Sequence, residues 1–546
     1  MKAPTILSLI ARLMILCGTA LLPAGTHAQD WDVLIRRARI IDGTGRPSFE
    51  GNVAITGTRI ARVGQVEGPA RREIDATGLV LAPGFIDVHT HAEGILGAPD
   101  AENFVRMGVT TIIAGNCGAS EPNVAAFLGA VETKKVAINI ATLVGHNAVR
   151  EQVMGSGSAR PPTAQELNRM KSLVEQAMRE GALGLSTGLI YSPGKYSRTD
   201  EIIELAKVAA AYHGIYTTHV RDEQEGLFAS LQEAFAVGRG AKIPVEISHL
   251  KLSGNLISPQ KPETIRYLEK ARAEGLVTNV IIALEKARQE GLKISQDLYP
   301  YSGATAFLTR LIPPSACEGG RDQLERRLAD PNERAKISAA MQQDLLRSGH
   351  TNYAHAVIVT ARRYKRLQGM TLVEAAQERR GTKSLDAQID LILEIEGNGG
   401  ASIILYEMNE PDLIPLMLLR QTMFISDSGT FQFGNETAHP RGYGSAARIL
   451  ARYVREEKLL SLEEAIRRMT SLAASTFQLK DRGEIREGAW ADLAIFDPLT
   501  VRDEASFASP HVCAVGFKHV FVNGMETVTN DRHTGARAGR AVRRGE

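Results

Sequence analysis

Cysteine is scarce in this chain of 546 residues, and its few cysteines lie far apart. Of the four, Cys117, Cys317 and Cys513 lie outside the first 28 residues. An odd number of widely separated cysteines excludes the disulfide framework of a small secreted domain. A thiol in such a chain therefore calls for a different explanation, and Cys117 offers one below.

The amino-terminal apolar run is also too short to span a membrane. Residues 13–24, LMILCGTALLPA, are twelve in number, whereas a transmembrane helix needs about 20 apolar residues. Lys2 and Arg12 precede the run, and Thr26-His27-Ala28 follows it as a small-residue cleavage site. This order is typical of a signal peptide. We therefore expect cleavage near Ala28 and export of the mature chain to the periplasm.

An excess of charge of either sign is missing as well. Removal of residues 1–28 takes away two basic residues and no acidic ones, so the mature chain has 62 basic and 62 acidic residues. Balanced charge gives no reason to expect nucleic acid or a membrane surface as a partner. Nothing in these patterns indicates an oligomeric state.

Short β-rich segments are present at both ends of the mature chain. They cover residues 32–42, 53–64, 491–497 and 519–528. The last contains Asn523-Gly524, a strong signal for a tight hairpin turn. These patterns predict a small β-sandwich built from both termini, residues 29–82 and 479–546.

Between the two ends, eight β-rich runs alternate with helical segments. The runs are residues 84–91, 110–117, 137–146, 182–189, 215–220, 244–250, 293–300 and 422–429. Thr163 and Glu166 form a capping box at the start of a helix predicted over residues 163–180. The alternation predicts the α/β class and a (β/α)8 TIM-type barrel over residues 83–478. A doubly wound parallel sheet is the structural alternative.

Two features interrupt this series. About 120 residues separate the seventh run from the eighth, far more than one helix needs. We expect residues 302–400 to form an insertion over one side of the barrel mouth. The segment Leu268–Leu276 recurs as Leu284–Leu292, which predicts an extended or doubled helix.

Side chains that can bind a metal fall at the ends of the predicted strands. They are His89, His91, Cys117, His219, His249 and Asp427. Each alone has a plainer interpretation, such as a packed histidine, a small buried cysteine or an aspartate that caps a helix. The carboxyl ends of barrel strands meet at one rim, where barrel enzymes hold their active sites. Because imidazole, thiolate and carboxylate groups are zinc ligands, the set predicts a zinc site in a hydrolase.

Eight longer segments carry a resemblance to a known family. They are PGFIDVHTH at 83–91, GNCG at 115–118, STGLIY at 186–191, HVRDE at 219–223, SHLK at 248–251, DLYPY at 297–301, SDSG at 426–429 and HPRGYG at 439–444. Through them the mature chain resembles the N-acyl-D-amino-acid deacylases, or D-aminoacylases, of the amidohydrolase superfamily. The paired histidines mark only the superfamily. Cys117 is more specific, because most two-metal relatives use a carboxylated lysine on the fourth strand, where this chain has Ser186-Thr187-Gly188.

The resemblance implies roles for individual residues. One tight zinc would be held by Cys117, His219 and His249, and a second, weaker position by His89, His91, Cys117 and Asp427. Asp427 would serve as the general base and then as the general acid. The substrate, chiefly its carboxylate, would be held by Lys251, Arg441, Tyr191 and Tyr299.

The implied reaction is hydrolysis of an N-acyl-D-amino acid to a carboxylate and a free D-amino acid. A dipeptidase acting on a C-terminal D-residue and a cyclic-amide hydrolase of the dihydroorotase or hydantoinase type are the alternatives. A degenerate barrel that only binds ligands is the non-enzyme alternative, and it predicts gaps in the ligand set that the sequence does not show.

Departures from the family pattern affect substrate preference. The paired histidines are followed by Ala92-Glu93 where the family often has aspartate, and the segment after Asp427 is longer than usual. Arg310 follows the seventh strand. If its side chain points into the barrel mouth, we expect a substrate with an acidic side chain; if it points outward, we expect a substrate with a neutral, apolar side chain. His146, in the motif GHN, is interpreted as structural.

Overall fold

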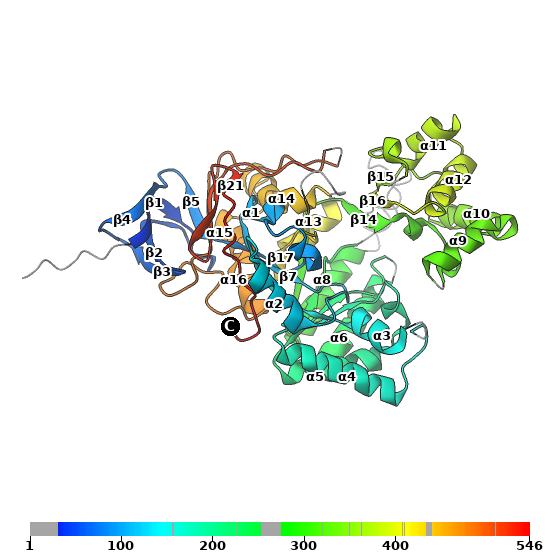
Figure 1. Ribbon diagram of the computed structural model, residues 1–546, viewed down its shortest axis with the longest axis horizontal. Coiled ribbons are helices and arrows are strands. Elements are labelled where there is room, and N and C mark those ends of the chain that lie inside the picture. The colour runs from blue at the N-terminus through cyan, green and yellow to red at the C-terminus, as the bar shows by residue number, and fades with distance from the viewer. Residues whose placement is uncertain are drawn as a thin grey trace, which may run out of the picture.

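The computed structural model describes residues 31–546 apart from residues 156–157, 225, 253–274, 319, 349, 362, 407, 409, 433–438 and 508. The predicted signal peptide lies outside these residues. Within them, no helix combines the length and the apolar character needed to cross a lipid bilayer. In Figure 1 a β-sheet lies at one end, the barrel in the middle and a mainly helical body at the other end.

Parallel strands form a closed barrel in the middle of the chain. In order they are β6 (Phe85–Asp87), β7 (Val109–Ala114), β8 (Asn139–Thr142) with β9 (Val144–Gly145), β10 (Gly184–Gly188), β11 (Ile215–His219), β12 (Val245–Ile247), β13 (Ile294–Leu298) and β17 (Thr422–Phe424). The first and last strands meet through a parallel bridge between Thr90 and Ser428. The amide of Asp427 also donates to the His89 carbonyl at 3.1 Å. This closure confirms the predicted (β/α)8 barrel and excludes the doubly wound alternative.

The third barrel strand is divided, although the sequence predicts one strand over residues 137–146. β8 pairs with β7, whereas β9 pairs with β10. The strand changes partner at Leu143, whose amide still donates to the Ala114 carbonyl at 2.9 Å. The prediction also ran one residue too far, because His146 is the first residue of helix α3 (His146–Met154).

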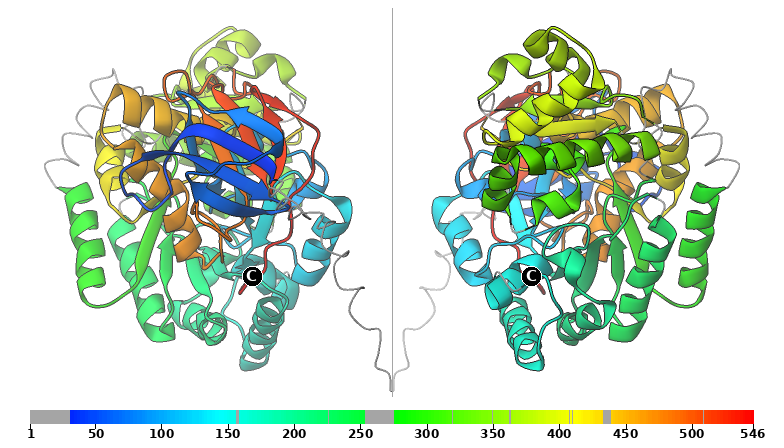
Figure 2. Two further views of the ribbon diagram at one scale, coloured as in Figure 1. Left: turned by 90° about the vertical axis from the view of Figure 1, so that its left-hand side faces the viewer. Right: turned by 90° about the vertical axis from the view of Figure 1, so that its right-hand side faces the viewer.

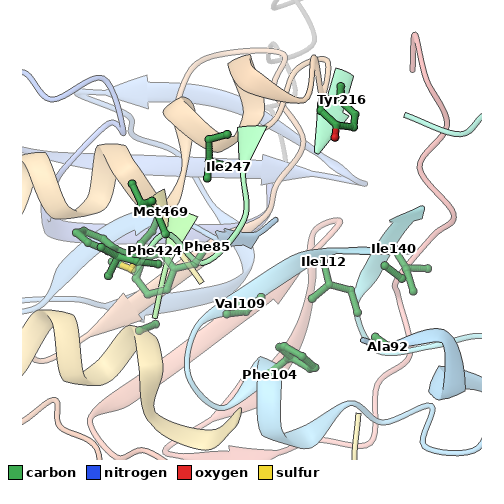
Figure 3. Close-up of a cluster of buried hydrophobic side chains, with 14 of the residues drawn as sticks. Phe85, Ala92, Phe104, Val109, Ile112, Ile140, Tyr216, Ile247, Phe424 and Met469 are labelled. Carbon is green, nitrogen blue, oxygen red and sulfur yellow. The ribbon is translucent and has the colours of Figure 1, made fainter. Parts of the chain in front are cut away.

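Helices surround the barrel and bury its outer side chains. They include α2 (Val124–Lys134), α4 (Ala164–Arg179), α5 (Thr199–Ala211), α6 (Leu227–Ala241), α8 (Leu276–Gln289), α13 (Glu410–Leu418), α14 (Arg441–Arg448), α15 (Leu462–Met469) and α16 (Ser471–Thr476). Both hydrogen bonds of the predicted capping box of Thr163 and Glu166 are present at the start of α4. In Figure 3, Ile112 of β7, Ile247 of β12 and Met469 of α15 belong to one apolar core cluster.

The repeated sequence segment is described only in part. Its second copy, Leu284–Leu292, covers the end of α8 and the turn after it. Most of the first copy lies outside the described residues. The expectation that the two copies extend or double one helix therefore stays a prediction.

Both ends of the described chain share one β-sheet, which faces the viewer in the left view of Figure 2. Its nine strands are β1 (Trp31–Ile40), β2 (Phe49–Thr56), β3 (Arg59–Gly64), β4 (Ala70–Asp75), β5 (Val80–Pro83), β18 (Leu493–Phe496), β19 (Phe517–Val522), β20 (Met525–Thr529) and β21 (Arg532–His533). β5 pairs with β18 and joins the two halves, and Ile35, Ile55 and Phe521 share one core. The predicted Asn523-Gly524 turn is confirmed, since both residues have positive φ between β19 and β20.

Residues 303–406, between β13 and α13, build a separate body on the far side of the barrel from this sheet (Figures 1 and 2). Its antiparallel sheet contains β14 (Gly303–Phe307), β15 (Ala356–Thr360) and β16 (Ser402–Tyr406). Its main helices are α9 (Arg321–Ala329), α10 (Pro331–Arg347), α11 (Leu372–Arg380) and α12 (Leu385–Glu396). Leu308, Met341 and Ile392 belong to a core of its own, so this body does not depend on the barrel core for its packing.

Candidate metal centre and active site

Three residues just past barrel strands share an unusual backbone conformation. Cys117 after β7, His249 after β12 and Asp427 after β17 have φ of 53°, 35° and 50°. Positive φ is disfavoured for residues that carry a Cβ atom. Such strain is kept where the surrounding structure enforces it, and it is concentrated at functional sites.

Two glycines allow the loop of Cys117 to take its path. Gly115 has φ of 81°, and a Cβ atom there would lie 2.4 Å from the carbonyl oxygen of Leu143. Gly118 has φ of 76°, and its Cβ would lie 2.4 Å from Oδ1 of Asn147. The motif GNCG is therefore required by close packing on both sides of the thiol.

The thiol of Cys117 lies among three imidazoles. Its Sγ is 3.3 Å from Nε2 of His89, 3.6 Å from Nδ1 of His219 and 3.6 Å from Nε2 of His249. All four side chains are buried. Burial raises the pKa of the thiol, but the charge of His89 and hydrogen bonds from the other two rings outweigh it and hold that pKa well below its ordinary value. The thiolate is thus the stable form.

This donor set fits a metal ion. In a tetrahedral zinc site with bonds of about 2.3 Å to sulfur and 2.0–2.1 Å to nitrogen, sulfur and nitrogen lie about 3.5 Å apart. The separations of Cys117 from His219 and His249 agree with that value. A buried thiolate facing several imidazole nitrogens also matches the ligand preference of zinc.

Asp427 faces a second set of groups beside the thiol. Its Oδ1 is 3.2 Å from Nε2 of His91 and 3.7 Å from Nε2 of His89. Its Oδ2 is 2.8 Å from Nη1 of Arg441. Burial raises the pKa of the Asp427 carboxyl, but Arg441 and His91 outweigh it and hold that pKa well below the ordinary value. Asp427 therefore carries its charge at neutral pH.

Two buried carboxylates that the sequence analysis did not single out stand behind the histidines. Oδ2 of Asp297 is 3.3 Å from Nδ1 of His89, and its Oδ1 accepts from the amide of His249. Oε1 of Glu223 is 3.1 Å from Nδ1 of His249 and pairs with Lys251. Both acids belong to segments that match the family, DLYPY and HVRDE. Asp297 lies near the end of buried strand β13 and Glu223 lies four residues after buried strand β11, and this placement at the rim of the barrel is the sequence signal that points to them.

The residues predicted to hold a substrate carboxylate lie beside the cluster, where Arg441 pairs with Asp427 and Lys251 contacts Glu223 and His249. The Tyr299 ring centre is 4.5 Å from Cζ of Arg441 and 5.8 Å from Nζ of Lys251. All three side chains are buried. Tyr191 differs, because it is 49% exposed and its ring packs on His219 with 4.7 Å between centroids. The first three therefore form one group, and Tyr191 lies at the outer edge.

The departures from the family pattern have identifiable places. Oε1 of Glu93 accepts from the amide of Gly115 at 2.7 Å and so braces the loop of Cys117. His146 contacts Glu201 at 2.9 Å inside a buried pair with Arg150, as its structural interpretation requires. Arg310 is exposed in a short 3-10 helix, Leu308–Leu311. Part of the long segment after Asp427 lies outside the described residues.

Comparison with known proteins identifies the family. The profile described as "Amidohydrolase family" matches residues 72–275 and 429–528. D-aminoacylase of Alcaligenes xylosoxydans xylosoxydans is 33% identical, with 95% of this chain and 99% of that protein covered. N-acyl-D-glutamate deacylase of the same organism is 32% identical, with 94% and 96% covered.

A solved structure agrees with these relatives. The N-acyl-D-glutamate deacylase of Bordetella bronchiseptica, in complex with zinc and a phosphonate inhibitor, superposes with a TM-score of 0.77. It is 30% identical, and the match covers 94% of this chain and all of that one. The chain therefore belongs to the D-aminoacylase family of the amidohydrolases and is a hydrolase.

Proposed function

We propose that this enzyme hydrolyses the amide bond of N-acyl-D-amino acids and releases a carboxylate and a free D-amino acid. One observation carries the proposal. A buried thiolate among three imidazoles lies beside two buried cations, Lys251 and Arg441, that flank one tyrosine ring. The first group suits a metal, and the second suits a carboxylate. An N-acyl amino acid offers both a carbonyl to activate and a carboxylate to bind.

We assign the cofactor as zinc. Cys117, His219 and His249 would hold the tight position, whereas His89, His91, Cys117 and Asp427 would hold a weaker one. A zinc ion held by these residues would polarise an amide carbonyl and would lower the pKa of a bound water to about 7. The buried thiolate and the short distances around Cys117 support a metal at this cluster. Cys117 also lies with His89 and His249 in one group whose ligand atoms are all within 4.8 Å of one another, so the division between the two positions rests on the resemblance to the family.

Asp427 is the proposed general base. It is ionised, it is buried, and its Oδ1 faces the metal cluster while Oδ2 is held by Arg441. It would accept a proton from the attacking water and then deliver it to the leaving amide nitrogen. Because the departing amine must gain a proton, one carboxylate in this position serves both steps.

The proposed carboxylate clamp consists of Lys251, Arg441 and Tyr299, with Tyr191 at the outer edge of the site. Arg441 can offer two N–H groups to one carboxylate, and Lys251 adds a compact charge. The D configuration is supported by the relatives, which are named as acting on D-substrates. Acidic substrates, D-glutamate and D-aspartate, occur among those names, so Arg310 is the residue to examine for the choice between acidic and neutral side chains.

A substrate panel tests the proposal. N-acetyl-D- and N-acetyl-L-forms of leucine, methionine, glutamate and aspartate are offered to the zinc-loaded enzyme, together with dipeptides that end in a D-residue and with hydantoin. We expect turnover of the D-series. Faster turnover of the L-series, or turnover of hydantoin or of the dipeptides alone, would refute it. An Arg310→Leu variant that loses only the acidic substrates would assign Arg310 to side-chain recognition.

We also propose that residues 1–28 direct export to the periplasm and are removed near Ala28. The basic start, the short apolar run and the small-residue site support this. Expression of the full chain followed by cell fractionation and intact-mass measurement tests it. A cytosolic protein that keeps residues 1–28 would contradict the proposal.

A further inference from the structure

Glu223 lies at a junction between the metal cluster and the carboxylate clamp. It is buried between β11 and α6, four residues after His219. One oxygen, Oε1, is 3.1 Å from Nδ1 of His249 and 3.7 Å from Nε2 of His219. The same oxygen accepts a hydrogen bond from Nζ of Lys251. A single carboxylate oxygen therefore faces two proposed metal ligands, His249 and His219, and one residue proposed to bind the substrate, Lys251.

The orientation of the His249 ring indicates how its contact with Glu223 supports metal binding. Its Nε2 points to Sγ of Cys117 at 3.6 Å, so its other nitrogen, Nδ1, faces Glu223. A neutral imidazole that binds a metal through Nε2 carries its proton on Nδ1 and donates it to an acceptor. Glu223 is that acceptor, and it fixes the ring orientation as Asp297 does for His89.

The contacts of the Lys251 ammonium indicate how the Glu223 carboxylate supports substrate binding. Its Nζ donates to Glu223 and to the backbone carbonyl of His249 at 3.3 Å. Nζ also lies 3.0 Å from Nδ1 of His249. Since that nitrogen keeps its own proton when Nε2 binds a metal, it does not accept from the ammonium, and one of the three ammonium protons remains for a substrate carboxylate. The buried charge of Lys251 is also balanced by Glu223, as a buried cation requires.

We propose that Glu223 is a positioning residue that couples the two halves of the site. It would hold the His249 ring for the metal and the Lys251 ammonium for the substrate carboxylate, without touching the reacting atoms. This inference rests on the proposed function and goes beyond it, because it predicts that metal affinity and carboxylate recognition depend on one side chain.

Glu223→Gln tests the coupling, because it keeps the size of the side chain and removes its charge. Glu204→Gln is the matched control; that residue pairs with Lys171 and Lys207 away from the site. Metal affinity is measured by chelator competition. KM and kcat are measured with N-acyl-D-amino acids and, for comparison, with their α-carboxamides, which lack the carboxylate. We expect Glu223→Gln to weaken metal binding about 10- to 100-fold. KM for the carboxylate substrates should rise about 10-fold or more, with a much smaller change for the carboxamides.

A second variant guards against misfolding. Glu223→Gln leaves Lys251 unpaired, whereas Glu223→Gln with Lys251→Met removes both charges. In a Lys251→Met background, the substitution at Glu223 should still weaken metal binding but no longer affect carboxylate recognition. Three results for Glu223→Gln would overturn the proposed coupling: a loss of metal affinity with unchanged carboxylate recognition, a loss of carboxylate recognition with unchanged metal affinity, or no change in either. Absence of deacylation by the unmodified enzyme would instead refute the proposed function, and the chelator measurement would remain valid.

Discussion

Replacement of Asp427 by asparagine separates catalysis from tight metal binding. The amide has nearly the shape of the carboxylate, but it carries no charge and is a very weak base. It can keep one oxygen toward Arg441 or His91, which now lie 2.8 and 3.2 Å from the carboxylate. General acid–base groups contribute about 10²- to 10⁴-fold to rate. We therefore expect kcat to fall about 10³-fold, or about 4 kcal/mol in activation free energy.

The assay compares kcat and zinc content for the unmodified enzyme, Asp427→Asn and a control. Asp200→Asn is a suitable control, because Asp200 is 70% exposed and pairs only at the surface with Arg198. Zinc in the tight position should stay bound in Asp427→Asn, since its proposed ligands are Cys117, His219 and His249. Activity within tenfold of the unmodified enzyme would refute the base assignment. Loss of the tight zinc would refute the proposed division of ligands.

Two further predictions concern stability. Arg482→Met should lower the free energy of unfolding by about 3–5 kcal/mol, because it removes the only cation paired with buried Asp492 among the described residues and leaves that charge uncompensated. Arg62→Met, at an exposed ion pair, should change the free energy of unfolding by less than about 1 kcal/mol. Equal urea midpoints for the two variants would contradict this prediction. Burial and the charge of His350 lower the pKa of His355 from 6.5 to about 3. The unfolded chain therefore binds this proton at a higher pH than the folded chain does. The stabilisation that results is present above about pH 6.5 and is lost as the pH falls toward 3. Urea unfolding at pH 7.5 and pH 5 should show a smaller decline for His355→Gln, and an unchanged decline would exclude His355 as its source.

The barrel and the site cluster could be predicted because local patterns specify them. The alternation of β-rich runs with helices needs no knowledge of distant contacts, and the Thr163 capping box and the Asn523-Gly524 turn are purely local signals. Since parallel strands of a barrel place their carboxyl ends at one rim, residues at strand ends converge once the fold is known. The six proposed metal ligands lie together for that reason.

Features that depend on partners could not be predicted. The third strand breaks at Leu143 because its two halves pair with different neighbours. Glu223 and Asp297 were overlooked because most acidic residues are solvent-exposed, and only the folded chain shows both buried behind histidines. The fold of the body between β13 and β17 likewise follows from its own core rather than from the barrel pattern.

Cys117 is the proposed metal ligand on which both the zinc assignment and the proposed reaction depend. X-ray absorption at the zinc edge, combined with a zinc count per chain, measures the atoms around the tightly bound metal. We predict one tight zinc with a single sulfur neighbour at about 2.3 Å and nitrogen or oxygen neighbours at about 2.0–2.1 Å, and loss of the sulfur signal in Cys117→Ser. A tightly bound zinc surrounded only by nitrogen and oxygen in the unmodified enzyme would contradict the account.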